Sequence, residues 1–151
     1  GWDSDEPVDE AFEKAVEFAL TILTNHFRQV EGIRRGQELV RKALEESDKT
    51  VVVLPVFAPW KGILAPSEAK IVIYPSSRGG FGVQCVPKQE GSNELKISFP
   101  EKLCGREKET LVELTGIEGI TFCHPAGFLS STQTLEDAMK LAEFVLKSEG
   151  I

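Results

Sequence analysis

Hydrophobic positions recur along this chain with two different periods, and the change from one to the other separates predicted helices from predicted strands. A helical stripe begins near Pro7 and runs to Val30, and a second helical pattern covers residues 33–46. Gly32 and Gly36 weaken helical structure there, so the pattern fits either two helices or one bent helix. The apolar positions of the first stripe are Phe12, Val16, Ala19, Leu20, Leu23, Phe27 and Val30.

Short apolar runs rich in β-branched residues follow. The continuous run at residues 50–54 is typical of a central strand, buried on both faces. Residues 69–74 and 81–87 predict two strands joined by a hairpin through Ser-Ser-Arg-Gly-Gly. The proline-rich segment 55–64 predicts an ordered loop rather than a regular element.

The last third of the chain mixes both periods. Residues 88–94 predict a polar loop, 95–99 a short edge strand, and 107–114 a short helix. Residues 120–123 then predict a buried strand, followed by a small-residue loop that carries a histidine. The final amphipathic helix begins after Thr134, which with Asp137 forms the pattern of an N-terminal capping box.

The order of these elements predicts one domain over residues 1–151, of class α/β (α+β). We expect a mixed β-sheet with helices before it and one helix after it. Hydrophobic residues make up 41% of the 151 residues and charged residues 27%, which is ordinary for a folded globular domain.

Charge and cysteine content restrict the partners and the compartment. The formal net charge of −7 counts against a free-standing nucleic-acid binder unless basic residues cluster. No apolar run is long enough to cross a membrane, so we expect no membrane association. Three widely spaced cysteines favour a reducing, intracellular compartment, whether cytoplasm, nucleus or mitochondrion.

Catalytic and metal-binding motifs are missing from the sequence. It has no CxxC pair, no HExxH, no GxSxG, no Walker loop and no GxGxxG behind a strand. His26 falls inside a predicted helix, where a histidine is usually structural. We therefore expect no metal site and no catalytic residue in this chain.

Four residues remain as candidates for ligand binding. Trp60 and Lys61 could stack a base and meet a phosphate, although a core tryptophan followed by an exposed lysine is the favoured interpretation. Gln84 either contacts a polar ligand or faces water. His124 follows a buried strand and precedes Ala-Gly-Phe, where Gly127 lets a ligand approach the backbone. A ligand-binding and a structural histidine are equally consistent with that spacing.

Three ordered motifs resemble a known family: VVVLPVFAPWKGIL, FGVQCVP and TGIEGITFCHPAGFLSSTQTLEDAMKLAEFVL. They are similar to the C-terminal half of the MYG (melanocyte proliferating gene protein) family, in the DHH superfamily of metal-dependent phosphoesterases. The resemblance implies the substrate-binding lobe of a 3′–5′ exonuclease acting on RNA or short oligonucleotides. It implies a separate catalytic N-terminal lobe that holds manganese, so the C-terminal lobe alone should be inactive. The resemblance is compatible with a monomer and with an oligomer.

The resemblance also implies site residues. Trp60 and Lys61 match the family's Pro-Trp-Lys, Gln84 its Val-Gln, and His124, Gly127 and Phe128 its His-x-x-Gly-Phe. Where relatives have Gly-Gly and a basic residue, this chain has hydroxyl side chains, at Ser130, Ser131 and Thr132.

We expect these hydroxyls, His124 and the N-terminus of the last helix to face a phosphate together. The alternative is a non-catalytic binding or protein-interaction domain that has lost nuclease function. The net charge of −7 and the replaced glycines favour that alternative.

Overall fold

The computed structural model describes residues 29–151 of the chain. The helix predicted from Pro7 therefore lies almost wholly outside the described residues, as does His26. The second helical pattern is confirmed as one helix, α2 (Gln29–Glu46). No helix in the described part is long and apolar enough to cross a membrane.

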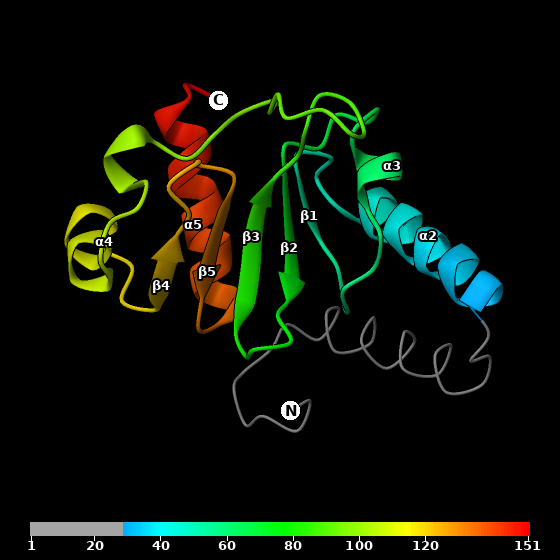
Figure 1. Ribbon diagram of the computed structural model, residues 1–151, viewed down its shortest axis with the longest axis horizontal. Coiled ribbons are helices and arrows are strands. Elements are labelled where there is room, and N and C mark those ends of the chain that lie inside the picture. The colour runs from blue at the N-terminus through cyan, green and yellow to red at the C-terminus, as the bar shows by residue number, and fades with distance from the viewer. Residues whose placement is uncertain (1–28) are drawn as a thin grey trace.

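A mixed five-stranded sheet forms the centre of the domain, as predicted (Figure 1). Its spatial order is β1-β2-β3-β5-β4, with β1 parallel to β2 and every other pair antiparallel. The strands are β1 (Val51–Val53), β2 (Ile71–Pro75), β3 (Phe81–Cys85), β4 (Ile120–Cys123) and β5 (Leu129–Thr132).

Helices cover the sheet from two sides (Figure 1). α5 (Leu135–Ser148) packs Leu141 and Val145 against Ile73 and Val83 on one face. α2 and the single turn α3 (Lys61–Leu64) pack on the other face, over β1 and β2. The 3-10 turn η1 (Glu101–Leu103) and α4 (Lys108–Thr115) lie beside β4.

The strand at residues 51–53 lies at an edge of the sheet, so the prediction of a central strand is wrong. Its central side chain, Val52, is nevertheless fully buried, because Val40 of α2 and the segment around α3 cover it. A continuous apolar run indicates that both faces of a strand are buried. An edge strand that a helix covers is also buried on both faces, so the run does not distinguish an edge strand from a central one.

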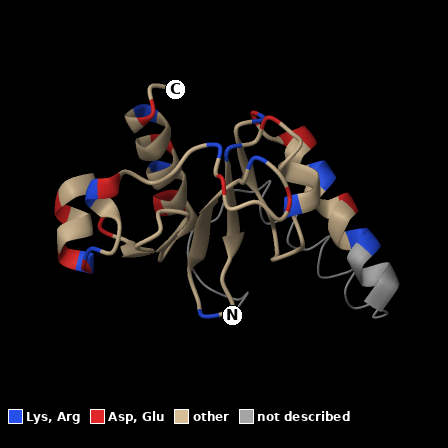
Figure 2. Ribbon diagram, turned by 45° about the horizontal axis from the view of Figure 1, so that its top comes forward, with Lys and Arg blue, Asp and Glu red and all other residues tan. Residues whose placement is uncertain are grey.

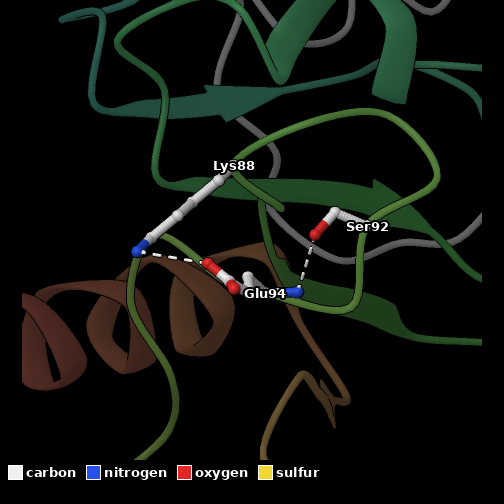
Figure 3. Close-up of polar contacts among 3 residues, drawn as sticks. All are labelled: Lys88, Ser92 and Glu94. Carbon is white, nitrogen blue, oxygen red and sulfur yellow. Dashed lines mark hydrogen bonds and ion pairs between the residues drawn. The ribbon is translucent and has the colours of Figure 1, made fainter.

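Residues 95–99 form no regular strand, contrary to the prediction, and only Leu95 makes an isolated bridge, to Pro87. The backbone bonds of this segment go to different partners. Lys96 N donates to Val86 O at 3.0 Å, whereas Phe99 N donates to Gly127 O at 2.9 Å. The preceding polar loop is confirmed, and the exposed Lys88–Glu94 pair closes it at 3.6 Å (Figure 3).

Lys96 ties this segment to the turn after α3. Its Nζ donates to the carbonyl oxygens of Leu64 (3.1 Å), Ser67 (2.5 Å) and Ala69 (2.7 Å). These bonds join the lysine to the last residue of α3 and to the turn that follows it. Burial, together with Lys70, lowers the pKa of Lys96. This lysine is therefore a structural clamp.

Residues 129–132 were expected in a loop, and they form β5, an interior strand between β3 and β4. β4 and β5 make a hairpin, and α5 follows β5 directly. Thr134 caps α5 as predicted, because its side chain accepts a hydrogen bond from Asp137 N at 3.1 Å. The strand, the hairpin turn and the helix therefore follow one another without a separate binding loop.

Candidate functional site

His124 opens the tight turn that joins β4 to β5. Gly127 N donates to His124 O at 2.9 Å, and His124 N donates to Leu129 O at 2.8 Å. Gly127 has a φ of +76°, which other residues rarely adopt, and an added Cβ would lie 3.1 Å from the Cys104 sulfur. Glycine is thus required at position 127 for backbone angle and for space.

The imidazole of His124 is held in one orientation. Its Nδ1 accepts a hydrogen bond from Ala126 N at 2.9 Å. In the neutral ring Nε2 then carries the proton and is a donor. The ring lies 4.6 Å from the Phe128 ring and 6.1 Å from the Phe122 ring, centroid to centroid. His124 is half-buried, and no described residue hydrogen-bonds to Nε2, so that donor is available for a ligand.

Part of the sheet face that carries α2 and α3 is uncovered by any described helix. α2 contacts β1 and α3, whereas α5 packs against β3, β5 and β4 from the other side. Strand register brings together on this face Tyr74, Gly82, Ser131 and Phe122 in one row across the sheet. Gln84 pairs with Leu129 in the next row, and Leu129 pairs with His124. We call this surface the open face.

Gln84, predicted as a candidate from its strand face, does lie on the open face. The Tyr74 hydroxyl donates to Gln84 Oε1 at 2.6 Å. Burial raises the pKa of Tyr74, so its hydroxyl stays protonated as a donor. The amide NH2 of Gln84 is the group left to meet a ligand.

Ser130 and Thr132 do not face a ligand, contrary to the expectation. Alternation along β5 points both side chains toward α5, where they are buried. Ser130 Oγ hydrogen-bonds to Phe122 O, and Thr132 Oγ1 donates to Thr134 O at 2.8 Å. Ser131 alone of the three hydroxyls lies on the open face, with Thr121 Oγ1 at 2.8 Å.

The N-terminus of α5 does not share a site with His124. His124 lies beside Leu129 at the start of β5, and α5 begins beyond the other end of that strand (Figure 1). Gln133 N bonds instead to Gly119 O at 2.8 Å, and an added Cβ at Gly119 would clash with the Asp137 carboxylate. The expected joint phosphate site of loop, histidine and helix is therefore wrong, because residues 129–132 extend as a strand.

Trp60 is 3% exposed and packs with Val52, Leu54 and Leu64. It is the core tryptophan of the favoured interpretation and cannot stack a base in this conformation. Lys61 is exposed at the start of α3, with its Nζ 5.8 Å from the Trp60 ring. The pair is thus divided between core and surface.

The described residues do not fit a metal ion, since no group of three or more His, Cys, Asp or Glu side chains is placed to hold one. Cys85 and Cys123 are buried and Cys104 is half-buried, all as free thiols. Burial raises the pKa of Cys85 and of Cys123 to about 12, with Cys104 adding to the effect at Cys123. Protonated thiols of this kind are neither metal ligands nor nucleophiles at neutral pH.

Charged residues are concentrated away from the sheet. Figure 2 shows Lys, Arg, Asp and Glu along the helices and loops, while the strands are uncharged. None of the five strands in the described part contains a charged residue. The open face is therefore neutral although the whole chain carries a net charge of −7.

Sequence reasoning missed two residues of this face, Tyr74 and Phe122. Phe122 lies two positions before His124 along the chain, whereas Tyr74 lies on β2 and pairs with Gly82, two positions before Gln84 on β3. Side chains two apart on a strand share a face. That period would have linked Phe122 to His124, whereas the pairing of β2 with β3 was needed for Tyr74.

Comparison with known proteins gives a consistent result. The profile of the MYG1_exonuc family, described as an uncharacterised protein family (UPF0160), matches residues 2–146. A MYG1 protein of Saccharomyces cerevisiae is 31% identical over 95% of this chain and 46% of its own length. A MYG1 protein of Dictyostelium discoideum is 30% identical over 94% of the chain and 48% of its own length.

A human protein named MYG1 exonuclease is 31% identical over 70% of this chain and 30% of its own length. The chain spans about half the length or less of these curated relatives. No solved structure matches it significantly.

Proposed function

The chain belongs to the MYG1 exonuclease family, and from that premise we propose that it is the substrate-binding half of a metal-dependent 3′–5′ exonuclease acting on RNA. The observation that carries the proposal is the open face. It presents an oriented histidine, an oriented glutamine amide and exposed aromatic rings on a neutral surface. Such groups suit an unpaired polynucleotide, which offers hydrogen-bonding edges and flat bases.

His124 has a positioning role in this proposal. Its Nε2–H donates to a phosphate or ribose oxygen near the end of the substrate, while Nδ1 stays bonded to Ala126 N at 2.9 Å. Gly127 keeps the turn close enough for the substrate backbone to approach. His124 therefore orients the scissile end, and it is not proposed to exchange a proton with it.

The reaction itself is proposed to take place in the half of the longer protein that this chain does not span. In the DHH type of phosphoesterase that we infer, manganese held by the other half would neutralise the charge of the phosphodiester. The described residues offer no cluster of ligands for such a metal. We accordingly propose that the two halves are needed together and that this chain alone does not hydrolyse RNA.

The complete gene product tests this proposal. Purified protein should shorten a 5′-labelled RNA oligonucleotide from its 3′ end in the presence of manganese. His124→Ala should lower kcat/KM about tenfold, since one oriented hydrogen bond is worth roughly 1.4 kcal/mol. Lys147→Ala is the matched control, because Lys147 is exposed on α5 and its ion pair among the described residues is with Glu143 at 3.0 Å. Unchanged kcat/KM in His124→Ala would contradict the role of the histidine.

A second function is favoured by one observation, the net charge of −7. In this alternative the domain binds a ligand or a protein and has lost its link to hydrolysis. The same assay separates the two functions. Complete gene product that leaves RNA intact with manganese and with magnesium would support the non-catalytic domain.

A further inference from the structure

The three cysteines of the chain gather beside the turn that carries His124, although they are widely spaced in the sequence. Cys123 ends β4 and directly precedes His124, Cys104 follows η1, and Cys85 ends β3. One backbone bond joins two of these segments, since Gly105 N donates to Cys123 O at 3.0 Å. Cys85 interacts electrostatically with both of the other thiols. The fold thus brings together three free thiols that the proposed function does not use.

Cys104 and Cys123 are the pair in direct contact. Hydrogen bonding between their thiols contributes to the raised pKa of Cys123. The backbone bond from Gly105 N to Cys123 O places the two Cα atoms roughly 5–7 Å apart by standard backbone dimensions, and a disulfide usually spans about 4.4–6.8 Å between Cα atoms. The two side chains therefore meet the geometric condition for a disulfide.

The segment that carries Cys104 packs against the His124 turn. An added Cβ at Gly127 would lie 3.1 Å from Cys104 Sγ, and an added Cβ at Gly105 would lie 3.4 Å from Pro125 Cγ. Both glycines have a positive φ, so side chains are excluded there by backbone angle as well as by space. A movement of the Cys104 sulfur is therefore felt by the turn that holds the histidine.

Burial assigns a different chemical role to each thiol. Cys104 is half-buried, whereas Cys85 and Cys123 are buried, so Cys104 is the thiol that a small solute in water can reach. Burial raises the pKa of Cys85 and of Cys123 to about 12, which keeps both protonated at neutral pH. The thiol of Cys85 points to Gly127 O at 4.0 Å. Cys104 is thus the thiol that reacts first, and Cys123 is its neighbour in direct contact.

We propose that Cys104 and Cys123 form a redox modification site, in which hydrogen peroxide converts the two thiols into a reversible disulfide that displaces the His124 turn. The thiolate of Cys104 attacks one peroxide oxygen, becomes a sulfenic acid, and releases hydroxide that takes up a proton to form water. The sulfenic acid condenses with the Cys123 thiol: the S–S bond forms, and the proton of Cys123 leaves with the hydroxyl as a second water. Small thiols reverse the step by thiol–disulfide exchange.

Disulfide formation changes the support of the turn. An S–S bond is about 2.0 Å long, so the two sulfur atoms must approach each other by roughly 1.5 Å from van der Waals contact. Cys104 Sγ gives up its bond to Pro100 O at 3.5 Å, and Cys123 moves the residue that follows it, His124. The effect on hydrolysis rests on the proposed function: a displaced Nε2–H no longer orients the substrate, so oxidation slows the reaction.

Peptide mass spectrometry of the 151-residue chain tests the bond itself. After treatment with excess hydrogen peroxide we expect a linked pair of peptides containing Cys104 and Cys123, which dithiothreitol separates. Dimedone, which traps sulfenic acids, should label Cys104 about tenfold more in Cys123→Ala than in the wild type, because the condensing thiol is missing. Cys85→Ala is the matched control and should keep the disulfide. Linkage of Cys104 to Cys85, or a wild-type Cys104 that accumulates as an unlinked acid, would overturn the proposal.

NMR of the histidine rings measures the effect on the turn. The chain has two histidines, so a His26→Gln variant identifies the ring resonance of His124. Peroxide should shift this resonance in the wild type and in Cys85→Ala, and dithiothreitol should restore it. Cys104→Ser should show no shift, with its fold confirmed by a cooperative unfolding transition. An unshifted His124 resonance in the fully linked chain would overturn the coupling between the disulfide and the turn.

The complete gene product separates this inference from the proposed function. Oxidation should lower kcat/KM on RNA about tenfold, as expected for the loss of one oriented hydrogen bond from His124, and dithiothreitol should restore it. Cys104→Ser should be insensitive to peroxide. Unchanged kcat/KM in the linked protein would overturn the effect on hydrolysis. Protein that leaves RNA intact in both redox states would contradict the proposed function, whereas the disulfide and the shifted histidine would still support the redox site.

Discussion

Gly82→Ala is the change that most directly tests how the open face is built. The new Cβ would lie 2.8 Å from Tyr74 Cε2 and 2.9 Å from Cζ, where carbon atoms normally approach to about 3.5–4.0 Å. The obstructing group is an aromatic ring packed against Phe57 and bonded to Gln84. It must move by roughly 0.7 Å or more, and its hydroxyl must leave Gln84 Oε1.

The expected cost follows from three contributions. Overpacking costs about 1–3 kcal/mol, and the lost hydrogen bond between Tyr74 and Gln84 costs about 0.5–1.5 kcal/mol. Replacing glycine by alanine within a strand recovers about 0.5–1 kcal/mol. The free energy of unfolding should therefore fall by roughly 0.5–4 kcal/mol. Each kcal/mol lowers Tm by about 2–4 °C in a chain of this size.

A double-mutant cycle by urea unfolding isolates the clash. Gly82→Ala should destabilise the wild-type chain, and it should be neutral or stabilising in a Tyr74→Ala background, where no ring obstructs the methyl group. Gly36→Ala in α2 is the matched control. Its added Cβ would meet Ala58 and Pro59 only at ordinary distances of 3.6 and 3.7 Å, so it should stabilise the helix by about 1 kcal/mol.

The reasoning would be refuted if Gly82→Ala were as stable as the wild type. It would also fail if Gly82→Ala cost the same free energy with and without the Tyr74 ring. Either result would mean that the ring does not rest on Gly82, and the orientation of Gln84 would then need another explanation.

Four further predictions concern the hydroxyls of β5, the thiols and the metal content of the chain. Ser130→Ala should lower the free energy of unfolding by about 1–3 kcal/mol, because it removes the hydroxyl that bonds to the Phe122 carbonyl. Ser131→Ala should change that free energy by no more than about 0.5 kcal/mol, because Ser131 lies on the open face. Equal effects of the two substitutions would contradict the orientation of β5. Iodoacetamide at pH 8 should modify half-buried Cys104 first, because burial raises the pKa of Cys85 and of Cys123 to about 12. Peptide mass spectrometry measures the order of modification, and earlier alkylation of Cys85 or Cys123 would contradict this prediction. Their unfolded thiols ionise near pH 9.0, so stability should fall as the pH rises above 9. Elemental analysis of the untagged chain should find no stoichiometric zinc or manganese, and one tightly held equivalent would contradict the donor arrangement.

Local patterns in the sequence were enough to locate most elements. The amphipathic stripes of α2 and α5, the hairpin between β2 and β3 and the cap at Thr134 all depend on residues a few positions apart. These patterns arise from interactions between residues that are close in sequence, so they can be recognised from a short stretch of sequence alone. The family and its ordered motifs were visible in the same way, as a resemblance along the chain.

Strand β5 was missed because its side chains are the ones that loops also use. Leu-Ser-Ser-Thr lacks an apolar alternation, and buried Ser130 and Thr132 are satisfied only by carbonyls at Phe122 and Thr134. A buried hydroxyl is tolerated when it has a partner, and the partner becomes known only when the strands are paired. Because residues 129–132 extend as a strand, the N-terminus of α5 lies at the opposite end of β5 from His124.

The sequence by itself determined the family, the helices, the hairpin and the candidacy of His124 and Gln84. Only the tertiary structure decided that Trp60 belongs to the core, that β1 is an edge strand, and that Tyr74 and Phe122 share one row of the sheet. Tyr74 and Phe122 come from different parts of the chain, and the order β2-β3-β5-β4 places them at the two ends of one row of the sheet. Helical and strand periods depend on neighbouring residues, whereas a binding face depends on which distant strands pair, and no local pattern contains that pairing.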